Sequence, residues 1–351
     1  MRAFSLLMLA TAAIAATVTA PTRHGRQKGR RQNGGGGAYE QEHATYDDAC
    51  NIGFCSVWGA TIGGWGAEYQ FVKTLDQFSA AVSGTNEGVI IVDGTITGDN
   101  ARVEIGSSKS IVGTPGSSLT GITLSLNSSR NVIVRNLKIS KPPGDAIVLE
   151  NARSIWIDHN EISSVPDGSH LLSITRGSDY TTVTHNRFFD FAHPTNAAVS
   201  VGHSDNNAAQ DQDKLHVTFA RNHFSNVTSA ISFRYGTGHL FNSLYEGLKL
   251  GIETRTNADL FVESSIFNGP IEVSDVIYTS RNVWEIGYAS AKDLIINLAT
   301  YTTGGGRVAP DSLLSHDNIG YPYDWYFWET SRVKESVAKW AGQTLEFLVW
   351  E

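Results

Sequence analysis

The stretch that decides the fold begins with Val132-Ile-Val-Arg-Asn136, which three later runs repeat: Ile155-Trp-Ile-Asp-His-Asn160, Thr182-Val-Thr-His-Asn186 and Val217-Thr-Phe-Ala-Arg-Asn222. A fainter copy ends at Asn242, and successive asparagines are 24, 26, 36 and 20 residues apart. Each run is a short alternating strand that cannot bury its apolar face alone, so the repeats must stack on one another. The pattern predicts an all-β chain wound as a right-handed parallel β-helix, with the asparagine side chains forming a ladder at one corner.

The ends of such a solenoid need caps, because an uncovered last strand leaves its backbone groups unpaired. Thr74-Leu-Asp-Gln77 is a capping box and predicts a short helix that ends before Gly84. A second short helix is predicted from Ser331 to Trp340, packed on the solenoid. The apolar positions at helical spacing are Leu75, Phe78 and Val82 in the first helix and Val333, Val337 and Trp340 in the second.

The first residues carry an export signature. Residues 1–20 hold one basic residue, an apolar run and small residues near the end, which is typical of a signal peptide. Residues 21–44 include Arg30-Arg31 followed by glycines, and we interpret them as a processed or flexible segment. Residues 45–351 are predicted to form one β-helix domain, in which no segment approaches the roughly eighteen apolar residues of a membrane span. We therefore expect a secreted, extracellular monomer without a membrane partner.

Charge narrows the choice of partner. Six of the 27 basic residues lie within residues 1–31, which contain no acid, so the remainder carries 21 basic and 35 acidic residues. Such an acidic chain without a Lys/Arg block argues against a nucleic-acid partner. A hydrophobic content of 41% and 34 glycines fit a β-rich globular chain and exclude disorder and coiled coil.

Only two cysteines occur, Cys50 and Cys55, and in an exported chain they most simply form a disulfide. A metal site built on them would need two further ligands, which are not nearby in the sequence. Asn127-Ser-Ser and Asn226-Val-Thr match the glycosylation sequon, a weak signal that applies only in a eukaryotic secretory route.

Further motifs occur in order over residues 50–275 and again over 331–347. They are Cys50-Asn-Ile-Gly-Phe-Cys55, Asn131-Val-Ile-Val-Arg-Asn-Leu-Lys-Ile-Ser140, Gly144-Asp-Ala-Ile147, Trp156-Ile-Asp-His159, Gly202-His-Ser-Asp-Asn206, Lys214-Leu-His-Val-Thr218, Arg234-Tyr-Gly-Thr-Gly-His239 and Ala338-Lys-Trp-Ala-Gly-Gln-Thr-Leu345. Together they resemble the secreted fungal pectate lyases of polysaccharide lyase family one. The resemblance implies a pectin lyase-like parallel β-helix, a polysaccharide partner, and cleavage of polygalacturonate by β-elimination in polysaccharide degradation.

The resemblance also implies a cofactor and site residues. β-Elimination removes a proton beside a carboxylate, so the site must neutralise that carboxylate, normally with Ca²⁺ and basic side chains, and must hold a base. Arg234 matches a family arginine that is expected to bind a substrate carboxylate. Asp145 matches the first family calcium ligand. Arg176, close to these positions, either adds positive charge or pairs with Asp179.

The other calcium ligands of the family are substituted in this chain. The two remaining ligand aspartates fall on Ser169 and Ser173. Asp167 lies two residues before Ser169, where the period-two alternation of a strand keeps it on the same face. Asp167 either substitutes in part for the missing ligands, or the alignment slips by two residues. Asp145 and Asp167 are therefore the candidate metal ligands, with hydrogen bonding to a turn as the alternative for Asp145, and the Ca²⁺ that the family implies is not expected with the usual ligand set.

The catalytic residue is unknown from the sequence, because the family arginine falls on Ser229 or Ala230 and the family lysine on Ala197. His170 and His193 are new relative to the family pattern. Either could be a relocated base, and a neutral, methyl-esterified sugar would need no calcium; solvated loop histidines are the alternative.

Three features receive structural interpretations. Asp158 and His159 are interpreted as a satisfied buried pair, and the Gly202–Asn206 motif as a structural corner. The aromatic run Tyr321–Trp328 is interpreted as a plug over the C-terminal coil, with stacking on sugar rings as the alternative.

The leading hypothesis is a pectate lyase-like enzyme that acts on pectate or a related uronan. The resemblance favours an enzyme, although the expected ligands, lysine and arginine are largely missing. The alternative is a catalytically degenerate carbohydrate-binding protein on the lyase scaffold. A scaffold for surface interactions is the third possibility.

Overall fold

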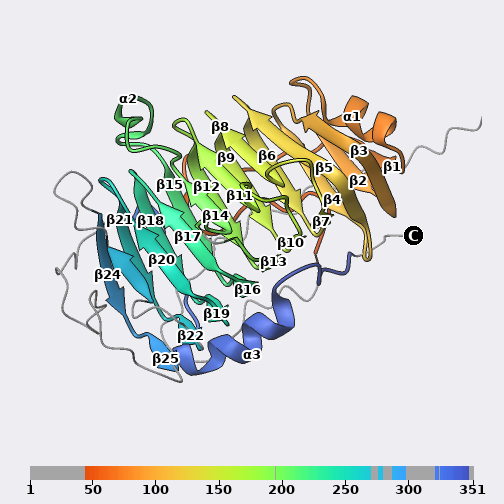
Figure 1. Ribbon diagram of the computed structural model, residues 1–351. Helices are drawn as coiled ribbons and strands as arrows, with labels where there is room; N and C mark the ends of the chain where they lie inside the picture. The colour runs from red at the N-terminus through yellow and green to blue at the C-terminus, as the bar shows by residue number, and fades with distance from the viewer. Residues whose placement is uncertain are drawn as a thin grey trace, which may run out of the picture. The chain divides into compact units, whose positions relative to one another are not determined.

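The repeats become successive coils of stacked strands (Figure 1). The computed structural model describes residues 44–193, 195–269, 276–279, 287–297, 321–323 and 325–347. All of these lie in one compact unit, Gln41–Glu351. The predicted signal peptide and all but the last residue of the predicted processed segment lie outside the described residues.

One wall of the solenoid is a ten-stranded parallel sheet, which we call the first sheet. Its strands, in order, are β1 (Tyr69–Val72), β2 (Gly88–Val92), β4 (Lys109–Gly113), β6 (Arg130–Arg135), β9 (Arg153–Asp158), β12 (Asp179–Thr184), β15 (His216–Ala220), β18 (Thr237–Phe241), β21 (Asp259–Glu263) and β24 (Tyr288–Lys292). Neighbours in the sheet are separated in sequence by a whole coil, which is the arrangement that the repeat spacing predicted.

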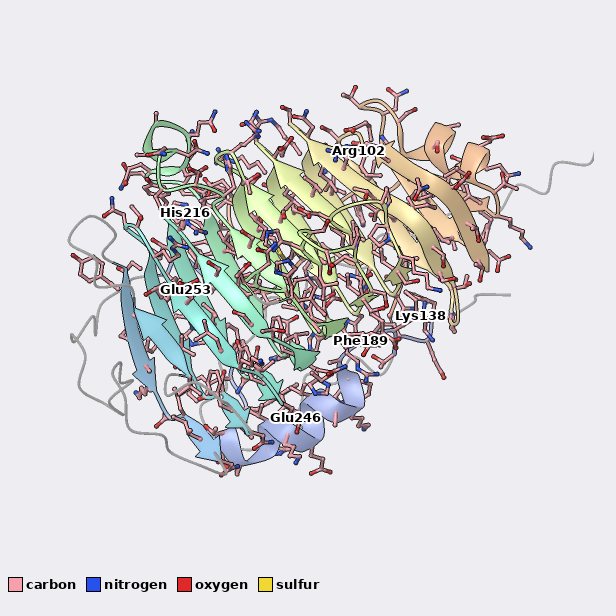
Figure 2. All side chains as sticks on the ribbon, viewed as in Figure 1. Arg102, Lys138, Phe189, His216, Glu246 and Glu253 are labelled. Atoms are coloured by element: carbon pink, nitrogen blue, oxygen red, sulfur yellow. A yellow bond between two sulfur atoms is a disulfide. The ribbon has the colours of Figure 1, made fainter. Side chains whose placement is uncertain are left out.

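The other two walls belong to one sheet that bends at the long strand β5 (Ser118–Asn127), which β3 (Thr95–Glu104) also pairs. The end of β5 starts what we call the site flank, which consists of β8 (Ile147–Glu150), β11 (Leu172–Thr175), β14 (Val199–Val201), β17 (Ser229–Phe233), β20 (Leu250–Thr254) and β23 (Ile277–Thr279). The start of β5 leads to the back flank, which consists of β7 (Lys138–Ser140), β10 (Glu161–Ser163), β13 (Arg187–Phe191), β16 (His223–Val227), β19 (Leu244–Glu246), β22 (Ile266–Asn268) and β25 (Ile295–Asn297). Figure 2 labels three back-flank residues, Lys138, Phe189 and Glu246.

The core lies between these walls and continues from coil to coil. Alternate residues of all three walls point inward and form one large apolar cluster. In the back flank, the aromatic rings of Phe188, Phe224, Tyr245 and Phe267 stack in succession with centroids 4.9, 5.1 and 4.4 Å apart. Equivalent positions of successive coils therefore meet, which confirms the predicted all-β parallel solenoid.

Both predicted helices are confirmed. Helix α1 (Leu75–Val82) follows Thr74, whose side chain accepts a hydrogen bond from the Gln77 amide, and it buries Phe78 and Val82. Helix α3 (Thr330–Trp340) buries Val333 and Val337 against apolar side chains of β19 and β22. A third, four-residue helix, α2 (Ala208–Asp211), was not expected. The described residues contain no helix that is long and apolar enough to cross a membrane.

Three of the asparagines form the predicted ladder. Asn160 accepts a hydrogen bond from the Leu137 amide, Asn186 from the Asn160 amide and Asn222 from the Asn186 amide, at 2.9 to 3.0 Å. Ser243 continues the ladder by accepting from the Asn222 amide at 3.2 Å. Buried amides at this corner are thereby paired from coil to coil, as buried polar groups must be.

The prediction was wrong for Asn136 and Asn242, which lie one position before the ladder. Strand pairing sets Arg135 opposite Asp158 and Ala220 opposite Phe241, so the next residues, Asn136 and Asn242, align with His159 and Arg221. The residues of this neighbouring column all have positive φ, between 44° and 59°. They are Asn136, His159, His185, Arg221, Asn242 and Ser264. Asparagine tolerates this conformation better than most residues, so its presence here has a local reason other than the ladder.

The two displaced asparagines hold residues 325–347, which we call the C-terminal strap. Asn136 Oδ1 accepts from the Leu345 amide at 3.0 Å, and Asn242 Oδ1 accepts from the Trp328 amide at 2.7 Å. Each asparagine also donates from Nδ2 to the carbonyl of the same strap residue. The strap therefore follows the column of positive-φ residues and carries α3 with it.

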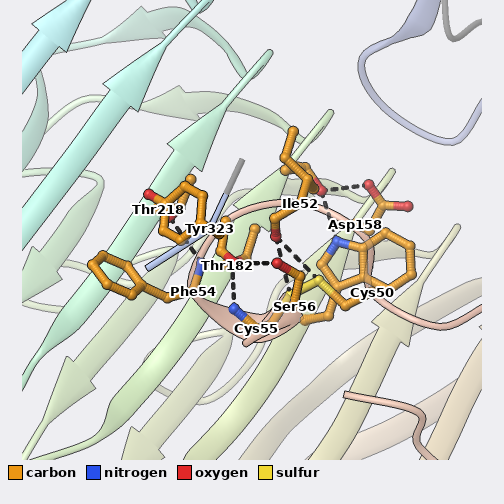
Figure 3. Close-up of a disulfide and its surroundings, with 12 residues drawn as sticks. Cys50, Ile52, Phe54, Cys55, Ser56, Asp158, Thr182, Thr218 and Tyr323 are labelled. Carbon is orange, nitrogen blue, oxygen red and sulfur yellow. Dashed lines mark hydrogen bonds between the residues drawn. A yellow bond between two sulfur atoms is a disulfide. The ribbon is translucent and has the colours of Figure 1, made fainter. Parts of the chain in front are cut away.

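The N-terminal segment lies on the outer face of the first sheet (Figure 3). A disulfide joins Cys50 to Cys55, and the short helix η1 (Phe54–Ser56) includes the second cysteine. The disulfide packs against Ile133 and Trp156, and the Cys55 amide donates to Thr182 Oγ1 at 3.0 Å. These contacts tie the segment to three coils.

Candidate functional site

Four serines, one valine and one glutamate form the outward column of the site flank, and the serines are at most 8% exposed. Their neighbours along each strand belong to the core, so alternation directs the column outward. The residues in register are Ser125, Val148, Ser173, Ser200, Ser232 and Glu253. Glu253 marks one end of this column in Figure 2, and Arg102, which donates to Ser125, marks the other. We call this column the hydroxyl strip.

The Asp145 carboxylate, beside the strip, is hydrogen-bonded on both oxygens. Asp145 precedes β8, and its Oδ1 accepts from the His170 amide at 2.8 Å, while its Oδ2 accepts from the Ser173 hydroxyl. Thr123 donates to the Asp145 carbonyl at 2.8 Å. Ser173 therefore lies where the sequence comparison placed a second ligand, and its hydroxyl binds the carboxylate directly.

These residues do not fit the calcium site that the resemblance implies. Ca²⁺ takes about six to eight oxygen ligands, usually with several carboxylates. Asp145 and Ser173 supply one carboxylate and one hydroxyl, while Asp167 is exposed in the turn at Pro166–Gly168 and has no hydrogen bond to Asp145 among the described residues. The structure thus brings Asp145 and Ser173 together but not Asp145 and Asp167, whose role as ligands stays a prediction.

Two histidines near the strip have opposite hydrogen-bonding patterns. His170 Nδ1 lies 2.7 Å from the Ala197 carbonyl oxygen, which can only accept, so Nδ1 carries the proton and a neutral ring keeps its lone pair on Nε2. His193 Nδ1 instead lies 2.9 Å from the Asn196 amide nitrogen and accepts its hydrogen. A neutral His193 therefore carries its proton on Nε2. Of the two, His170 has the tautomer of a base.

The two positions predicted to replace the family arginine carry no titratable side chain. Ala230 is fully buried in the core, and Ser229 is 9% exposed in β17 with no titratable group. Ala197 contributes only its backbone carbonyl, to His170. The substitution of the family arginine and lysine at these positions stays a prediction.

Arg234, the candidate substrate-binding residue, is held by a carboxylate that the sequence analysis did not single out. Asp205 Oδ1 lies 3.0 Å from Arg234 Nε, and its Oδ2 lies 3.2 Å from Arg255 Nη2. Thr256 donates to Asp205 Oδ1 at 2.7 Å, and Tyr235 donates to the Asp205 carbonyl. Burial acts to raise the pKa of Asp205, but the Thr256 hydrogen bond and the two guanidinium groups outweigh it and hold that pKa below its ordinary value.

The described arginines of this face are paired with acids. Arg102 contacts Glu104 at 3.1 Å, and Arg176 contacts Glu150 at 2.9 Å, which corrects the suggested pairing of Arg176 with Asp179. Together with the Arg234 and Arg255 contacts to Asp205, these pairs leave the strip with little uncompensated positive charge.

A second polar cluster lies away from the strip, at the ladder corner. Asp158, His159 and His185 place possible ligand atoms within 4.8 Å of one another, the one such metal-like group in the described part of the chain. However, Arg135 Nε contacts Asp158 Oδ2 at 2.8 Å, and its Nη1 contacts Asp48 at 2.7 Å. A guanidinium on the same oxygen repels a metal cation, so we interpret the group as a buried ion-pair network.

Burial and charge shift the pKa values in this network. Burial acts to raise the pKa of Asp158, but His159, His185 and Arg135 outweigh it and hold that pKa well below its usual range. Burial, with the adjacent His159, lowers the pKa of His185 to about 3. The structural interpretation of Asp158 and His159 therefore has a concrete form, a fully buried carboxylate whose neighbours are His159, His185, Arg135 and the Thr184 hydroxyl.

Two remaining predictions concern surface residues. Asn127 and Asn226 are both exposed, and their glycosylation stays a prediction. The aromatic run packs on the first sheet, where the Tyr323 hydroxyl lies 2.8 Å from Thr218 Oγ1 and the Tyr321 ring stacks on His239 at 4.3 Å. These rings are thus not part of the hydroxyl strip.

Comparison with solved structures defines the class of fold. A pectate lyase from Bacillus sp. N165, solved in complex with trigalacturonate, superposes with a TM-score of 0.69 at 23% identity and covers 84% of this chain and 98% of its own. A thermostable pectate lyase superposes with a TM-score of 0.72 at 18% identity and covers 86% and 99%. The parallel solenoid is therefore of the pectate lyase type.

Sequence relatives then give the family. The family model described as pectate lyase matches residues 41–283. Pectate lyase A of Aspergillus niger is 37% identical over 316 residues, covering 87% of this chain and 91% of the relative. Pectate lyase B of Colletotrichum gloeosporioides is 37% identical over 318 residues, covering 87% and 89%. The chain belongs to the pectate lyase family, as its motifs predicted.

Proposed function

We propose that the protein is a secreted polysaccharide lyase that cleaves pectate or a related uronan by β-elimination on the hydroxyl strip, with His170 as the base. Family membership supports the reaction class. The observation that carries the choice of base is the 2.7 Å contact between His170 Nδ1 and the Ala197 carbonyl, which leaves the Nε2 lone pair for a proton.

The reaction requires one proton transfer and one bond cleavage. His170 Nε2 takes the proton from the carbon next to the sugar carboxyl group. The electron pair forms a carbon–carbon double bond, the bond to the glycosidic oxygen breaks, and that oxygen takes up a proton from solvent. Arg234, oriented by Asp205, binds a carboxyl group of the substrate.

The charge pattern supports an esterified substrate. The fungal relatives are named pectate lyases, and pectate is fully charged, so it needs cations to neutralise it. Here the donor set at Asp145 does not fit Ca²⁺, and the described arginines of the face already contact acids. A methyl-esterified uronan carries fewer negative charges, so this site needs fewer cations to neutralise it.

Product formation tests the proposal. Ultraviolet absorbance of the unsaturated product is followed on polygalacturonate and on methylated pectin, each with added calcium and with chelator. We expect activity that survives chelator and is higher on methylated pectin. Product that appears only with calcium would instead mean that Asp145 and Asp167 assemble a metal site, and would overturn the calcium-free form of the proposal.

Two matched variants test the base. His170→Asn keeps an amide donor for the Ala197 carbonyl but removes Nε2, and we expect the rate to fall by about 10²- to 10⁴-fold. His193→Asn is the control, because its side-chain oxygen still accepts from the Asn196 amide and we expect an unchanged rate. Equal rates in the two variants would refute His170 as the base.

The paired charges favour a second candidate function, uronan binding without cleavage. Its signature is no product on any substrate together with retention on a pectin affinity gel. In that case Arg234→Gln is expected to reduce retention, because the residue still binds a carboxyl group.

A further inference from the structure

A second polar site lies on the turns that connect the site flank to the first sheet. A hollow of about 270 Å³ is lined by residues from four successive turns, including Arg130, Arg153, Asp179 and Lys214. Arg130 and Arg153 follow β5 and β8, and Asp179 follows β11. We call this site the basic hollow.

Its cations, unlike the arginines beside the hydroxyl strip, form no ion pair with the described residues, and only Lys214 has an electrostatic interaction with a nearby acid, Asp211. Arg130 and Arg153 are direct neighbours in strand register, where like charges repel. The side chains of Arg130, Arg153 and Lys214 are exposed, and none of them forms an ion pair with any described residue. Three unpaired cations in one hollow are notable in a chain with more acids than bases.

The one acid that lines the hollow is engaged elsewhere. Asp179 Oδ1 accepts from the His216 amide at 3.0 Å, from His216 Nδ1 at 2.7 Å and from the Tyr180 amide at 3.1 Å. Its side chain is only 13% exposed. Asp179 is in register with Arg153, but it forms an ion pair with neither arginine, and its Oδ1 holds the wall of the hollow.

Two of the cations are positioned by their surroundings. The Arg153 guanidinium lies 4.5 Å from the centre of the Tyr180 ring, and that ring stacks on His216 at 5.5 Å. Lys214 crosses Gly177, with its Cδ and Nζ atoms 2.9 and 3.1 Å from where a β-carbon on that glycine would lie. Any larger residue at this turn would displace the lysine. A cation held in place loses less entropy when it binds an anion.

The geometry points to a binding site for the free carboxylates of an acidic polysaccharide, separate from the hydroxyl strip. Arg130 and Arg153 lie on adjacent parallel strands, about 4.8 Å apart. Cations from neighbouring turns can each take one carboxylate of a polymer, and guanidinium groups bind carboxylates in bidentate fashion. The site goes beyond the proposed cleavage and rests on the proposed function only for the choice of a uronan as the polymer.

Binding measurements on charge-matched variants test this site. One variant replaces Arg130, Arg153 and Lys214 with glutamine, and the control replaces three exposed residues of α3, Arg332, Lys334 and Lys339, in the same way. Both lose three positive charges. We expect the hollow variant to bind polygalacturonate at least about tenfold more weakly than the control at low salt, and fully esterified pectin equally well.

Two further measurements keep the outcome clear. Thermal unfolding checks that both triple variants fold. If the triple variant of the hollow does not fold, the single variants Arg130→Gln and Arg153→Gln replace it. The binding assay needs no catalysis, so it reports even if no product forms on any substrate. Equal affinity of the two triple variants for polygalacturonate would overturn the proposal. Displacement by inorganic phosphate as effective as that by oligogalacturonate would also overturn it, by showing a general anion site.

Discussion

Ser173 determines what the Asp145 carboxylate can bind. Its hydroxyl donates a hydrogen bond to Oδ2 of Asp145. We therefore expect Ser173→Asp to place two carboxylates in contact and to lower the free energy of unfolding by about 1–3 kcal/mol in the absence of calcium. Added calcium should recover part of this loss, because a divalent cation offsets the repulsion. Urea unfolding with calcium and with chelator measures both effects.

The control is Ser200→Asp, the next position of the hydroxyl strip. Ser200 is in register with Ser173, but its hydroxyl contacts only the Gly202 carbonyl among the described residues. We expect a calcium effect no larger than in the wild type. Equal calcium stabilisation of the wild type and Ser173→Asp would contradict the argument that the present residues do not fit Ca²⁺.

His185 makes stability depend on pH. The pKa of His185 is about 3 in the folded state, below the ordinary value near 6.5. Below about pH 6.5 the unfolded chain therefore takes up a proton that the folded chain does not, and the free energy of unfolding falls. Between pH 7 and pH 5 this should cost about 2 kcal/mol of unfolding free energy. The stability that Asp158 contributes is lost only at lower pH, because its folded pKa is lowered below that of an ordinary carboxyl group.

His185→Asn isolates this contribution. Asparagine tolerates the positive φ of 51° and can still donate to Asp158 Oδ1, but it does not titrate. We expect the variant to lose about 2 kcal/mol less than the wild type between pH 7 and pH 5, measured by urea unfolding. The pH 7 to 8 interval is the internal control, because both proteins should behave alike there. Parallel pH profiles down to pH 5 would show that His185 is not the source.

At the scale of elements, the ladder pairs buried side-chain and backbone groups of successive coils. Asn186 Oδ1 accepts from both nitrogens of Asn160, and Asn186 Nδ2 donates to the Ile157 and Thr184 carbonyls. Asn186→Ala leaves these buried groups unpaired, and we expect a loss of about 3–4 kcal/mol in urea unfolding. Ser243→Ala, which removes one ladder acceptor, should cost about 1 kcal/mol. Similar costs for both changes would show that the ladder adds little beyond packing.

The sequence predicts elements better than it predicts their register. Alternation and spacing were sufficient to predict the stacked strands, and the capping box was sufficient to predict α1, because these signals are local. Aligning runs on their last asparagine failed at Asn136 and Asn242 because residue type alone does not reveal a one-residue offset between strands. Both residues bind a strap distant in sequence, which no local pattern encodes.

The same limit applies to the site. Asp145 and Arg234 were identified by single motifs, and both lie on the site flank or directly beside it. Asp205 was missed as an orienting residue because its contacts to Arg234 and Arg255 span 29 and 50 residues. Its own motif had been interpreted as a structural corner. The Ala197 contact that fixes the His170 tautomer likewise joins two coils through a backbone carbonyl, which residue type cannot signal.

At the scale of the whole molecule, the strap connects early coils to late ones. Leu345 is bound by Asn136 on an early coil, and Trp328 is bound by Asn242 on a late coil. The Gly342 amide donates to the His185 carbonyl at 2.7 Å between these points. A solenoid repeat by itself contacts only its neighbours, so we expect the strap, which adds contacts between distant coils, to couple their unfolding.

Glycine substitutions should release the strap. Each also removes one side-chain hydrogen bond to a neighbouring coil, from Asn136 to the Gly113 carbonyl or from Asn242 to the Ser264 carbonyl. Asn242→Gly and Asn136→Gly each remove two side-chain hydrogen bonds to the strap, and glycine adopts the local φ of 51° or 56° without strain. We expect hydrogen exchange of the α3 amides to rise by about tenfold in Asn242→Gly and further in the double variant, while the β9 amides keep their protection. Asn257→Gly is the matched control, because this exposed asparagine also has a positive φ, of 52°, and lies outside the strap. Unchanged α3 exchange in the double variant would mean that Val333 and Val337 alone hold the helix, and that the displaced asparagines serve only the turn in which they lie.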